Sequence, residues 1–442
     1  MKKISIIIII FLFFETCSFS FGADNVFLVN PTSLRIQVLS ENISLLEALR
    51  NVQNSKLNVS LARAKLLPSI NLSALLPALA SPTFLVSSVT FLFPFLVPSN
   101  WMVLRQQSEL LESDKAAYDA LQLNILSNSL SLYFTYLNDQ KTQLFFSNLS
   151  ETLGILYNRL KKQSEILGNV SIEDLGMASA QWQESKIKSS QLLELLIEEK
   201  AGLRTLLGLP LRTKIDVEDF DLLPSPYESK TVYEIADHSL KVAPEAMQLD
   251  FLIKAANSGK FAKVFGFMSS ASVFGTSFNN TSPFSILKAS GGFTFGMDNL
   301  VNIQIANNNI ESVKLRTQQL KFENERTAEI LVGEINEVKF QKVLSGNALR
   351  DRLSVYDAQK REYAIGLISL QTLLQTQVQL TDSYVANIKS ELDLKMQRLT
   401  LMRLVIDGDF SKIKRCKALL IPSRKTKKNR HDKGNSLDEV CR

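Results

Sequence analysis

The chain has 442 residues, of which 45% are hydrophobic and 21% are charged, and its formal net charge is +6. This composition excludes a chain that is disordered throughout, and the length allows two or three ordinary domains or one elongated body. Two histidines and three cysteines are too few for a Cys/His zinc site, a Cys–His nucleophile or a disulfide framework. The sequence also lacks phosphate-loop, dinucleotide-binding and nucleophile-elbow motifs, so we expect no catalytic site, no metal site and no cofactor.

The first segment, residues 1–22, is typical of a secretory signal peptide. Two lysines precede the apolar run Ile4–Phe14, and the small residues Ser20 and Gly22 follow it. A membrane anchor is the alternative, but a run of eleven residues is too short to cross about 30 Å of hydrocarbon. Lipid attachment at Cys17 is a poor fit, because no small residue directly precedes the cysteine. The remaining chain has no apolar run long enough for a spanning helix, so it would cross a bilayer only as strands of a closed barrel.

The rest of the chain repeats one plan with a period near 198 residues. Gly168 matches Gly366 at this offset, and Ser171 matches Ser369. Fixed self-similarity indicates one structural unit that has been duplicated. The predicted units are a linker over 23–42, a first repeat over 43–231 and a second repeat over 232–410.

Each repeat begins with a helix that is followed by a segment of alternating residues. The first helices are predicted near Ser44–Leu66 and Val232–Ala262, and the alternating strand segments at about 68–98 and 264–298. In the second repeat, Phe265 and Phe267 alternate with smaller or less apolar residues. Such strands fit lipid on one face and a lumen on the other. A soluble hairpin with one face on a core fits the alternation equally well.

Two long helical hairpins are the clearest structural pattern. They are predicted at about 101–208 and 302–406, with an equatorial segment at 209–231 between them. The first arm of each hairpin has no proline and would be about 90–100 Å long at 1.5 Å per residue. Ile310, Val313 and Thr317 follow a narrow apolar stripe, which predicts coiled-coil packing against partner helices. The sequence therefore predicts an elongated, mainly α fold with a small β part.

The tip of each hairpin combines a glycine with a serine three residues later. Gly168 and Gly366 end the long helices, and Ser171 and Ser369 are placed to cap the helices that follow. Asp174 completes a variant capping box with Ser171. Each repeat is therefore predicted to end in a tight antiparallel helical turn.

Four segments together resemble the TolC-like outer-membrane efflux proteins, and the resemblance extends over roughly Ile43–Asp409. They are LARAKLLPSINLSA at Leu61–Ala74, LLGLPL at Leu206–Leu211, VAPEAMQLDFLIKAA at Val242–Ala256 and YAIGLISLQTLL at Tyr363–Leu374. Each motif alone has moderate specificity. Their order, their spacing and the duplication are what make the resemblance strong.

The resemblance implies a homotrimer in the bacterial outer membrane, in which each subunit gives four strands to a shared twelve-stranded barrel. The helices would form a coiled-coil tunnel in the periplasm. Two hairpins in one chain cannot close a barrel, so other subunits must pair with their edge strands in lipid. The implied function is a passive exit duct for tripartite efflux or type I secretion, driven by an inner-membrane pump. A periplasmic adaptor protein would dock on the tips, at Gly168, Ser171, Gly366 and Ser369.

The resemblance also implies a constriction at the periplasmic end. Tyr363 and Asp174 occupy two of its positions, whereas Ile368 stands where an arginine is often found. Thr372 and Gln375 stand at two positions that are acidic in the family. We therefore expect a weaker polar network in the closed state and no acidic ring that favours cations. Helix capping by Asp174 and ordinary tip packing by Tyr363 explain these two residues equally well.

The predicted tail, 411–442, has eleven Lys and Arg against three Asp and Glu. We expect a solvated, disordered extension, with contact to an anionic surface or a partner as the alternative. Cys416 and Cys441 lie in this tail, and the sequence leaves their pairing open. Without the tail and the leader the chain is slightly acidic, which argues against nucleic-acid binding.

A periplasmic adaptor and an envelope hydrolase are the alternatives to an export duct. A periplasmic coiled-coil adaptor or scaffold without a pore would explain the helices, but not two matching phenylalanine-rich strand segments. An envelope hydrolase would need a base such as His238. This histidine lies on a predicted helix, where a surface or packing role is far more common.

Overall fold

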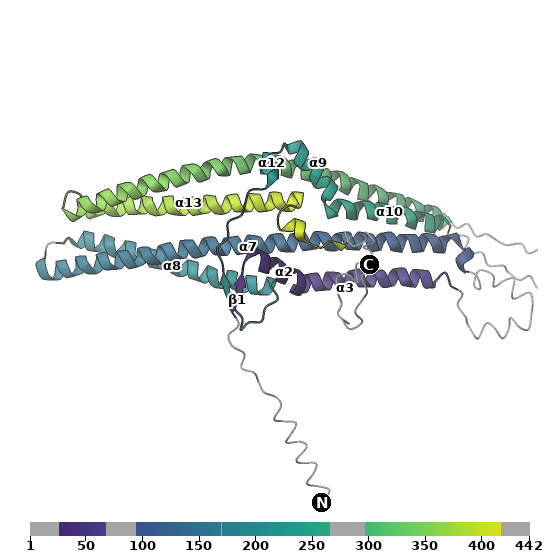
Figure 1. The fold of residues 1–442 in the computed structure, drawn as a ribbon, viewed down its shortest axis with the longest axis horizontal. Coiled ribbons are helices and arrows are strands. Elements are labelled where there is room, and N and C mark those ends of the chain that lie inside the picture. Colours follow the sequence, from purple (N-terminus) through teal and green to yellow (C-terminus); the bar gives the residue numbers. More distant parts are fainter. Residues whose placement is uncertain (1–25, 68–93, 169, 266–296, 417–442) are drawn as a thin grey trace, which may run out of the picture.

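The computed structural model describes residues 26–67, 94–168, 170–265 and 297–416. The predicted signal peptide, both predicted strand segments apart from their ends, and most of the basic tail lie outside these residues. The described chain is one elongated body in which long helices run side by side (Figure 1).

The elements follow the duplicated plan. The first half contains β1 (Val26–Val29), α2 (Pro31–Glu41), α3 (Ile43–Ala64), the short 3-10 helix η1 (Pro94–Leu96), α7 (Pro98–Leu167) and α8 (Ile172–Leu206). The second half contains β2 (Lys214–Val217), η2 (Pro226–Ser229), α9 (Val232–Val242), α10 (Pro244–Val264), α12 (Met297–Ala364), α13 (Leu370–Val405) and η4 (Phe410–Lys412).

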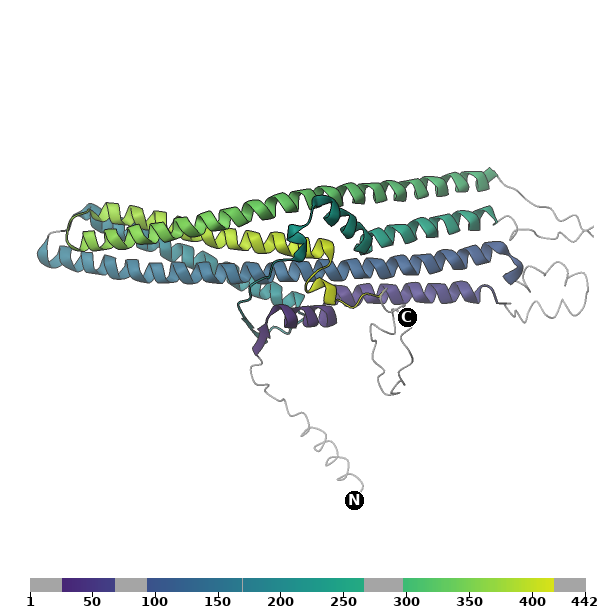
Figure 2. The same cartoon turned by 45° about the horizontal axis from the view of Figure 1, so that its top comes forward.

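The two long helices confirm the predicted hairpins. α7 has 70 residues and α12 has 68, so each is about 100 Å long. α7 packs against α8 and α12 packs against α13, while α3 and α10 lie beside the other halves of the long helices (Figure 2). None of the described helices has a stretch both long and apolar enough to span a membrane.

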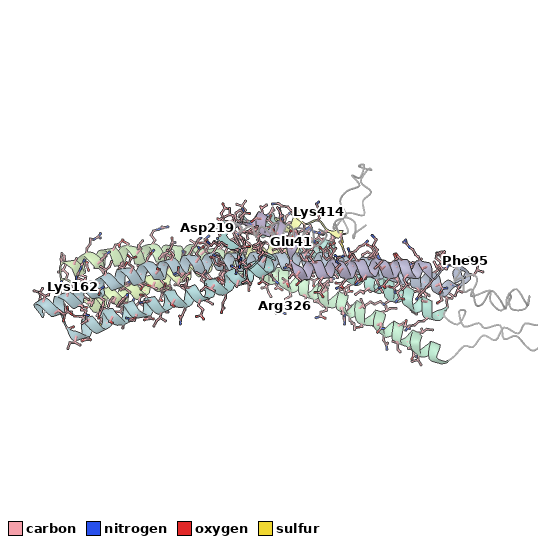
Figure 3. The ribbon with its side chains drawn as sticks, turned by 90° about the horizontal axis from the view of Figure 1, so that it is seen from below. Glu41, Phe95, Lys162, Asp219, Arg326 and Lys414 are labelled. Carbon is pink, nitrogen blue, oxygen red and sulfur yellow. The ribbon has the colours of Figure 1, made fainter. Side chains whose placement is uncertain are left out.

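The two ends of the body differ in what they carry. Phe95, just before α7, lies at one end, Lys162 lies close to the other, and Glu41 and Asp219 lie in the middle (Figure 3). The last turns of α3 and α10 and the first turns of α7 and α12 all lie at the Phe95 end (Figure 2). The chain therefore leaves the described body at one and the same end for both predicted strand segments.

The segment predicted as a linker, 23–42, is part of the folded body from Val26 onward. β1 pairs in parallel with β2, which belongs to the equatorial segment. Asn30 begins α2 with a reciprocal capping box to Ser33. Leu34 and Val38, one helical turn apart, are fully buried. One short strand and one buried helical face anchor this segment to the rest of the body.

The start of the predicted tail is also folded. Ile413 is buried and Cys416 is completely buried, and the Cys416 N–H donates to Asp119 Oδ1 at 2.8 Å. Cys416 is disulfide-bonded, with its partner outside the described residues. Phe410, Ile413 and Cys416 recur every three residues, a pattern that the surrounding lysines and arginines hide in the sequence. The disordered extension predicted from residue 411 is therefore wrong for residues 411–416, and the rest of the predicted tail lies outside the described residues.

Two observed element boundaries differ from the predicted ones because of prolines. The helix predicted over Val232–Ala262 is divided into α9 and α10 at Pro244, because proline has no N–H for the helical hydrogen bond and disfavours helical geometry just before it. The strand prediction is wrong for residues 94–98, since Pro94 begins η1 and Pro98 begins α7. All three prolines stand at the first residue of a helix, where the missing N–H costs nothing.

The main core lies in the middle of the body. Tyr133 and Phe134 of α7 are almost fully buried there, with their rings edge-on at 5.1 Å. Burial raises the pKa of Tyr133 above its ordinary value of 10.0, and its hydroxyl donates to the Glu218 carbonyl at 2.6 Å. The β1–β2 pair, α2 and the C-terminal segment all contribute buried residues to this core.

The narrow apolar stripe predicted on α12 is confirmed. Ile310, Leu331 and Ile335 are buried, and Val313 and Thr317 are half-buried. Other large apolar side chains of the same helix stay exposed in the single chain. They include Val301, Ile305, Leu315, Phe322, Phe340 and Val343. One subunit therefore covers only one side of α12.

Candidate functional site at the hairpin tips

Each tip turns on a glycine in the left-handed conformation. Gly168 has φ 60° and Gly366 has φ 79°, and an added Cβ at either position would meet no atom within 4 Å. These glycines are therefore required for their backbone conformation and not for space. The predicted turn positions are confirmed.

Both predicted N-caps are also confirmed. The Ser171 hydroxyl accepts from the Asp174 N–H at 2.9 Å and donates to Asp174 Oδ2 at 2.8 Å. The Ser369 hydroxyl accepts from the Thr372 N–H at 3.2 Å, and the two hydroxyls lie 3.0 Å apart. Asp174 also places a negative charge at the positive end of the α8 dipole. Capping therefore accounts for the position of Asp174 on its own.

An apolar cluster beneath the tips joins the two hairpins. Its buried members come from α7, α8 and α13, and Tyr363 of α12 packs against them. The buried members of this cluster are Leu153, Leu160, Ala178, Leu370 and Leu374. Tyr157 and Trp182 also pack against this cluster. Their rings are stacked, with centroids 5.3 Å apart. An added Cβ at Gly154 would lie 3.0 Å from Trp182 Nε1, so this glycine makes room for the indole.

Tyr363 and Asp174 lie within electrostatic range of each other. Burial is the main cause that raises the pKa of the Tyr363 phenol, the Asp174 carboxylate raises it further, and Arg159 opposes both. Charged groups of α8 and α7 thus act on the Tyr363 phenol of α12. Arg159 was not predicted from the sequence, because this residue lies about two helical turns before the nearest recognisable motif, the turn at Gly168.

Thr372 and Gln375 do not join this group. Both are exposed on the first turns of α13, and Thr372 serves the Ser369 cap. The first turn of α13 contains no acidic residue. These two positions are therefore polar and uncharged in the structure.

The outer surface of the tips is unusually apolar. Ile172 is 92% exposed, and Ile365 and Leu367 are 73% and 71% exposed. Ile166 and Leu167 at the end of α7 are exposed as well. Burial of such side chains against another protein would be favourable, at about 25 cal/mol per Å² of apolar surface.

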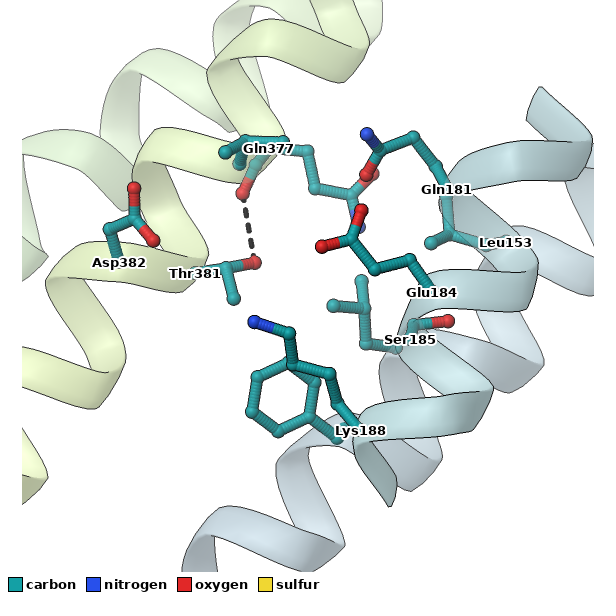
Figure 4. Close-up of a pocket in the computed structure, with 11 residues that line it drawn as sticks. Leu153, Gln181, Glu184, Ser185, Lys188, Gln377, Thr381 and Asp382 are labelled. Atoms are coloured by element: carbon teal, nitrogen blue, oxygen red, sulfur yellow. Dashed lines mark hydrogen bonds between the residues drawn. The ribbon is translucent and has the colours of Figure 1, made fainter. Parts of the chain in front are cut away.

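A cavity of about 140 Å³ lies behind the tip cluster, between the two hairpins (Figure 4). α7 supplies an apolar floor, and α8 and α13 supply polar walls. The lining residues are Phe146, Leu149, Leu153, Gln181, Glu184, Ser185, Lys188, Gln377, Val378, Thr381 and Asp382. Glu184 and Lys188 reach from α8 toward α13, where the Thr381 hydroxyl donates to the Gln377 carbonyl at 3.0 Å. The lining contains no histidine or cysteine.

His238 has the packing role that the sequence predicted. Its Nε2 atom lies 3.0 Å from the Tyr227 hydroxyl, and the two rings are 4.9 Å apart. Over the described ranges, His, Cys, Asp and Glu side chains form no group of three or more that would hold a metal ion.

Comparison with known proteins gave similar folds and no similar sequences. No protein-family model matches the chain, and no curated protein sequence does. Among solved structures, the Campylobacter jejuni CmeC outer membrane channel has a TM-score of 0.63 at 14% identity, over 89% of this chain and 93% of that chain. The outer-membrane channel OprN has a TM-score of 0.66 at 13% identity, over 86% and 90%. The open state of the Neisseria gonorrhoeae MtrE outer membrane channel has a TM-score of 0.62 at 13% identity, over 85% and 88%.

This chain has the fold of the outer-membrane channels. The agreement extends over nearly the whole length of each channel chain, so it includes both repeats. It confirms the TolC-like fold and the mainly helical architecture that the resemblance predicted. At this level of identity the likeness concerns the fold and leaves residue roles to be argued from this chain.

Proposed function

We propose that this protein is an outer-membrane channel and serves as the exit duct of an efflux or secretion system. The proposal includes an N-terminal signal peptide, a homotrimer and a periplasmic position for the helices. An inner-membrane pump would supply the energy, and a periplasmic adaptor would connect the pump to the duct. The protein itself would conduct passively and perform no catalysis.

One observation carries the proposal. The chain leaves the described helical body for residues 68–93 and 266–296 at the same end, opposite the tips (Figure 2). Phenylalanines alternate with other residues in both segments, at Phe91 and Phe93 in the first and at Phe293 and Phe295 in the second. Two hairpins at one end of a helical rod are what a barrel shared among subunits requires. The likeness to outer-membrane channels supports the same arrangement.

The exposed apolar side chains of α12 support the trimer. Leu315, Phe322 and Phe340 are each more than half exposed in the single chain. A soluble protein seldom exposes a row of large apolar side chains along a helix without a partner. Equivalent helices of two further subunits would cover them in a closed tunnel.

The apolar tips support adaptor docking. Gly168, Ser171, Gly366 and Ser369 shape the two turns, and exposed isoleucine and leucine side chains flank them. The adaptor surface that meets them should accordingly be apolar at its centre. Inside the tips, Tyr363 and Asp174 are the proposed constriction residues, with Thr372 and Gln375 as uncharged neighbours.

The alternative is a periplasmic coiled-coil scaffold without a pore. Membrane fractionation followed by gel electrophoresis without heating separates the two. A channel is expected in the outer-membrane fraction as a trimer that heating converts to the monomer. A scaffold would be recovered from the periplasm without detergent, and that result would refute the channel.

A further inference from the structure

The end of the body that carries Phe95 is basic, whereas the opposite end is nearly neutral (Figure 3). Four ranges at the Phe95 end contain five Lys and Arg against one Asp. They are 58–67, 94–105, 256–265 and 297–306. The tips, over 159–175 and 359–375, contain five Lys and Arg against four Asp and Glu. Because the chain without its tail and leader is slightly acidic, the basic charge is a local feature of one end.

Four of these cations, which we call the collar, lie at the ends of α3 and α10. They are Arg63, Lys65, Lys260 and Lys263. Three of them are exposed, and Lys260 is half-buried. None of the four forms an ion pair with a residue that the structure describes. The fifth cation, Arg105 of α7, lies 4.0 Å from Glu109 and is partly neutralised by it. The collar therefore presents positive charge without a counter-charge from the described chain.

Large apolar side chains are interleaved with the collar and are exposed as well. They are Leu61, Leu67, Phe95, Leu96 and Phe261. Trp101 is half exposed beside them, and its indole N–H donates to the Phe95 carbonyl at 2.7 Å. The polar atom of the indole is thus satisfied by the backbone, while its ring remains available for another surface. Tryptophan next to exposed apolar and basic side chains is typical of a membrane–water interface.

The helix dipole explains only part of this pattern. It favours a cation in the last turn, where α3 carries Arg63 and α10 carries Lys263. A cation in that position needs no external partner. The dipole gives no reason, however, for exposed apolar side chains among the cations. A surface that is both apolar and basic calls for a partner that is both apolar and acidic.

We propose that the collar binds anionic phospholipid at the periplasmic face of the outer membrane. The cations would lie against lipid phosphates, and Trp101 and the apolar side chains would enter the boundary between headgroups and acyl chains. The positive charge favours anionic over zwitterionic lipid, because only anionic lipid gives the bilayer surface a net negative charge. This inference rests on the proposed channel, which places the Phe95 end at the membrane.

The two tryptophans of the chain lie at opposite ends and allow a test that separates the ends. Trp182→Phe leaves Trp101 as the reporter beside the collar, and Trp101→Phe leaves Trp182 as the control in the tip cluster. The purified protein is placed in phosphatidylcholine nanodiscs that contain a minor fraction of lipid with brominated acyl chains. Brominated phosphatidylglycerol should quench Trp101 about threefold more strongly than the same amount of brominated phosphatidylcholine. Neither lipid should quench Trp182.

Matched charge variants show whether the collar causes the preference. Lys260→Gln combined with Lys263→Gln should reduce the preference for phosphatidylglycerol by at least about half. Lys161→Gln combined with Lys162→Gln removes two exposed cations near the tip and should leave it unchanged. A preference that persists undiminished in the collar variant would overturn the proposal.

The remaining outcomes separate the collar from the channel. Equal quenching of Trp101 by both lipids would overturn the collar and leave the channel in place. Quenching by neither lipid would contradict the membrane position of this end, and with it the proposed channel. The wild type provides a second measurement without substitutions. Its Tm should be higher in nanodiscs with phosphatidylglycerol than in phosphatidylcholine alone, and high salt should remove the difference. Equal Tm values at low salt would also overturn the collar.

Discussion

Single glycines decide where this chain turns, and their effects should have opposite signs at different positions. Gly366 has φ 79°, a conformation that an alanine adopts only at a cost of about 1 kcal/mol. Gly333 lies within α12, where an added Cβ meets no atom within 4 Å. Gly366→Ala should therefore destabilise the protein by about 1 kcal/mol, whereas Gly333→Ala should stabilise it by about 0.5–1 kcal/mol. Denaturant unfolding of both variants checks the pair, and equal signs would contradict the turn geometry.

Asp174 combines two explanations that a matched pair of variants can separate. It caps α8 together with Ser171, and its charge helps to raise the pKa of Tyr363 in the other hairpin. If it restrains a closed tip, Asp174→Ala should raise the open probability in planar bilayers. Glu173→Ala removes an exposed acid of the same turn and should leave conductance unchanged. Conductance that is equal in all three proteins would leave Asp174 with its capping role alone.

Among the elements, the short helix η2 is held to the second hairpin by one carboxylate. Glu228 lies 2.6 Å from Lys339 of α12 and 2.9 Å from Arg398 of α13, and its side chain is only 6% exposed. It also completes the capping box of Ser225. Glu228→Gln would leave two cations facing each other without a counter-charge, so we expect a loss of about 3 kcal/mol.

Glu234 is a matched control for Glu228. It completes a capping box in the same way, with Thr231, but its side chain is half exposed and its ion pair with Lys230 spans 3.5 Å. Glu234→Gln should therefore have a clearly smaller effect, since solvent screens the pair. Thermal unfolding compares the two. Equal losses would show that capping, and not the ion pairs, makes Glu228 important.

The sequence predicted the elements that depend on local rules. Gly168, Gly366, Ser171 and Ser369 follow turn and cap chemistry that is the same in any context. The long helices follow from apolar periodicity without proline. Packing between distant segments was harder to predict. Arg159 approaches Tyr363 only because two hairpins meet, and no spacing in the sequence places them together.

The β1–β2 pair and the ordered start of the tail were also not predicted, because both depend on contacts between distant segments. The β1–β2 pair joins segments 188 residues apart, as the Asn30–Glu218 hydrogen bond also does, so neither half looks like a strand by itself. The ordered start of the tail depends on the Asp119 carboxylate, which accepts the Cys416 N–H. The charge density of a short segment can be read from its sequence, whereas a contact with a distant partner cannot. Neither contact was therefore predicted.

At the scale of the whole molecule, the described chain is a rod with an incomplete surface. Its equator is closed by a well-packed core, while one side of α12 and both tips expose large apolar side chains. Self-association would cover the side, and a partner would cover the tips. The two ends thus differ in their proposed tasks, with docking at the tips and the membrane at the opposite end.

The account depends most on the passage of ions through a membrane-inserted trimer. Protein extracted from the outer membrane in detergent and added to a planar bilayer should give uniform single-channel steps, and the conducting species should contain three chains. Substitution of Asp174 should alter the closed fraction and leave the unitary step in place. A purified chain that stays monomeric and dissolves without detergent, or a trimer that inserts and never conducts, would contradict the proposed duct.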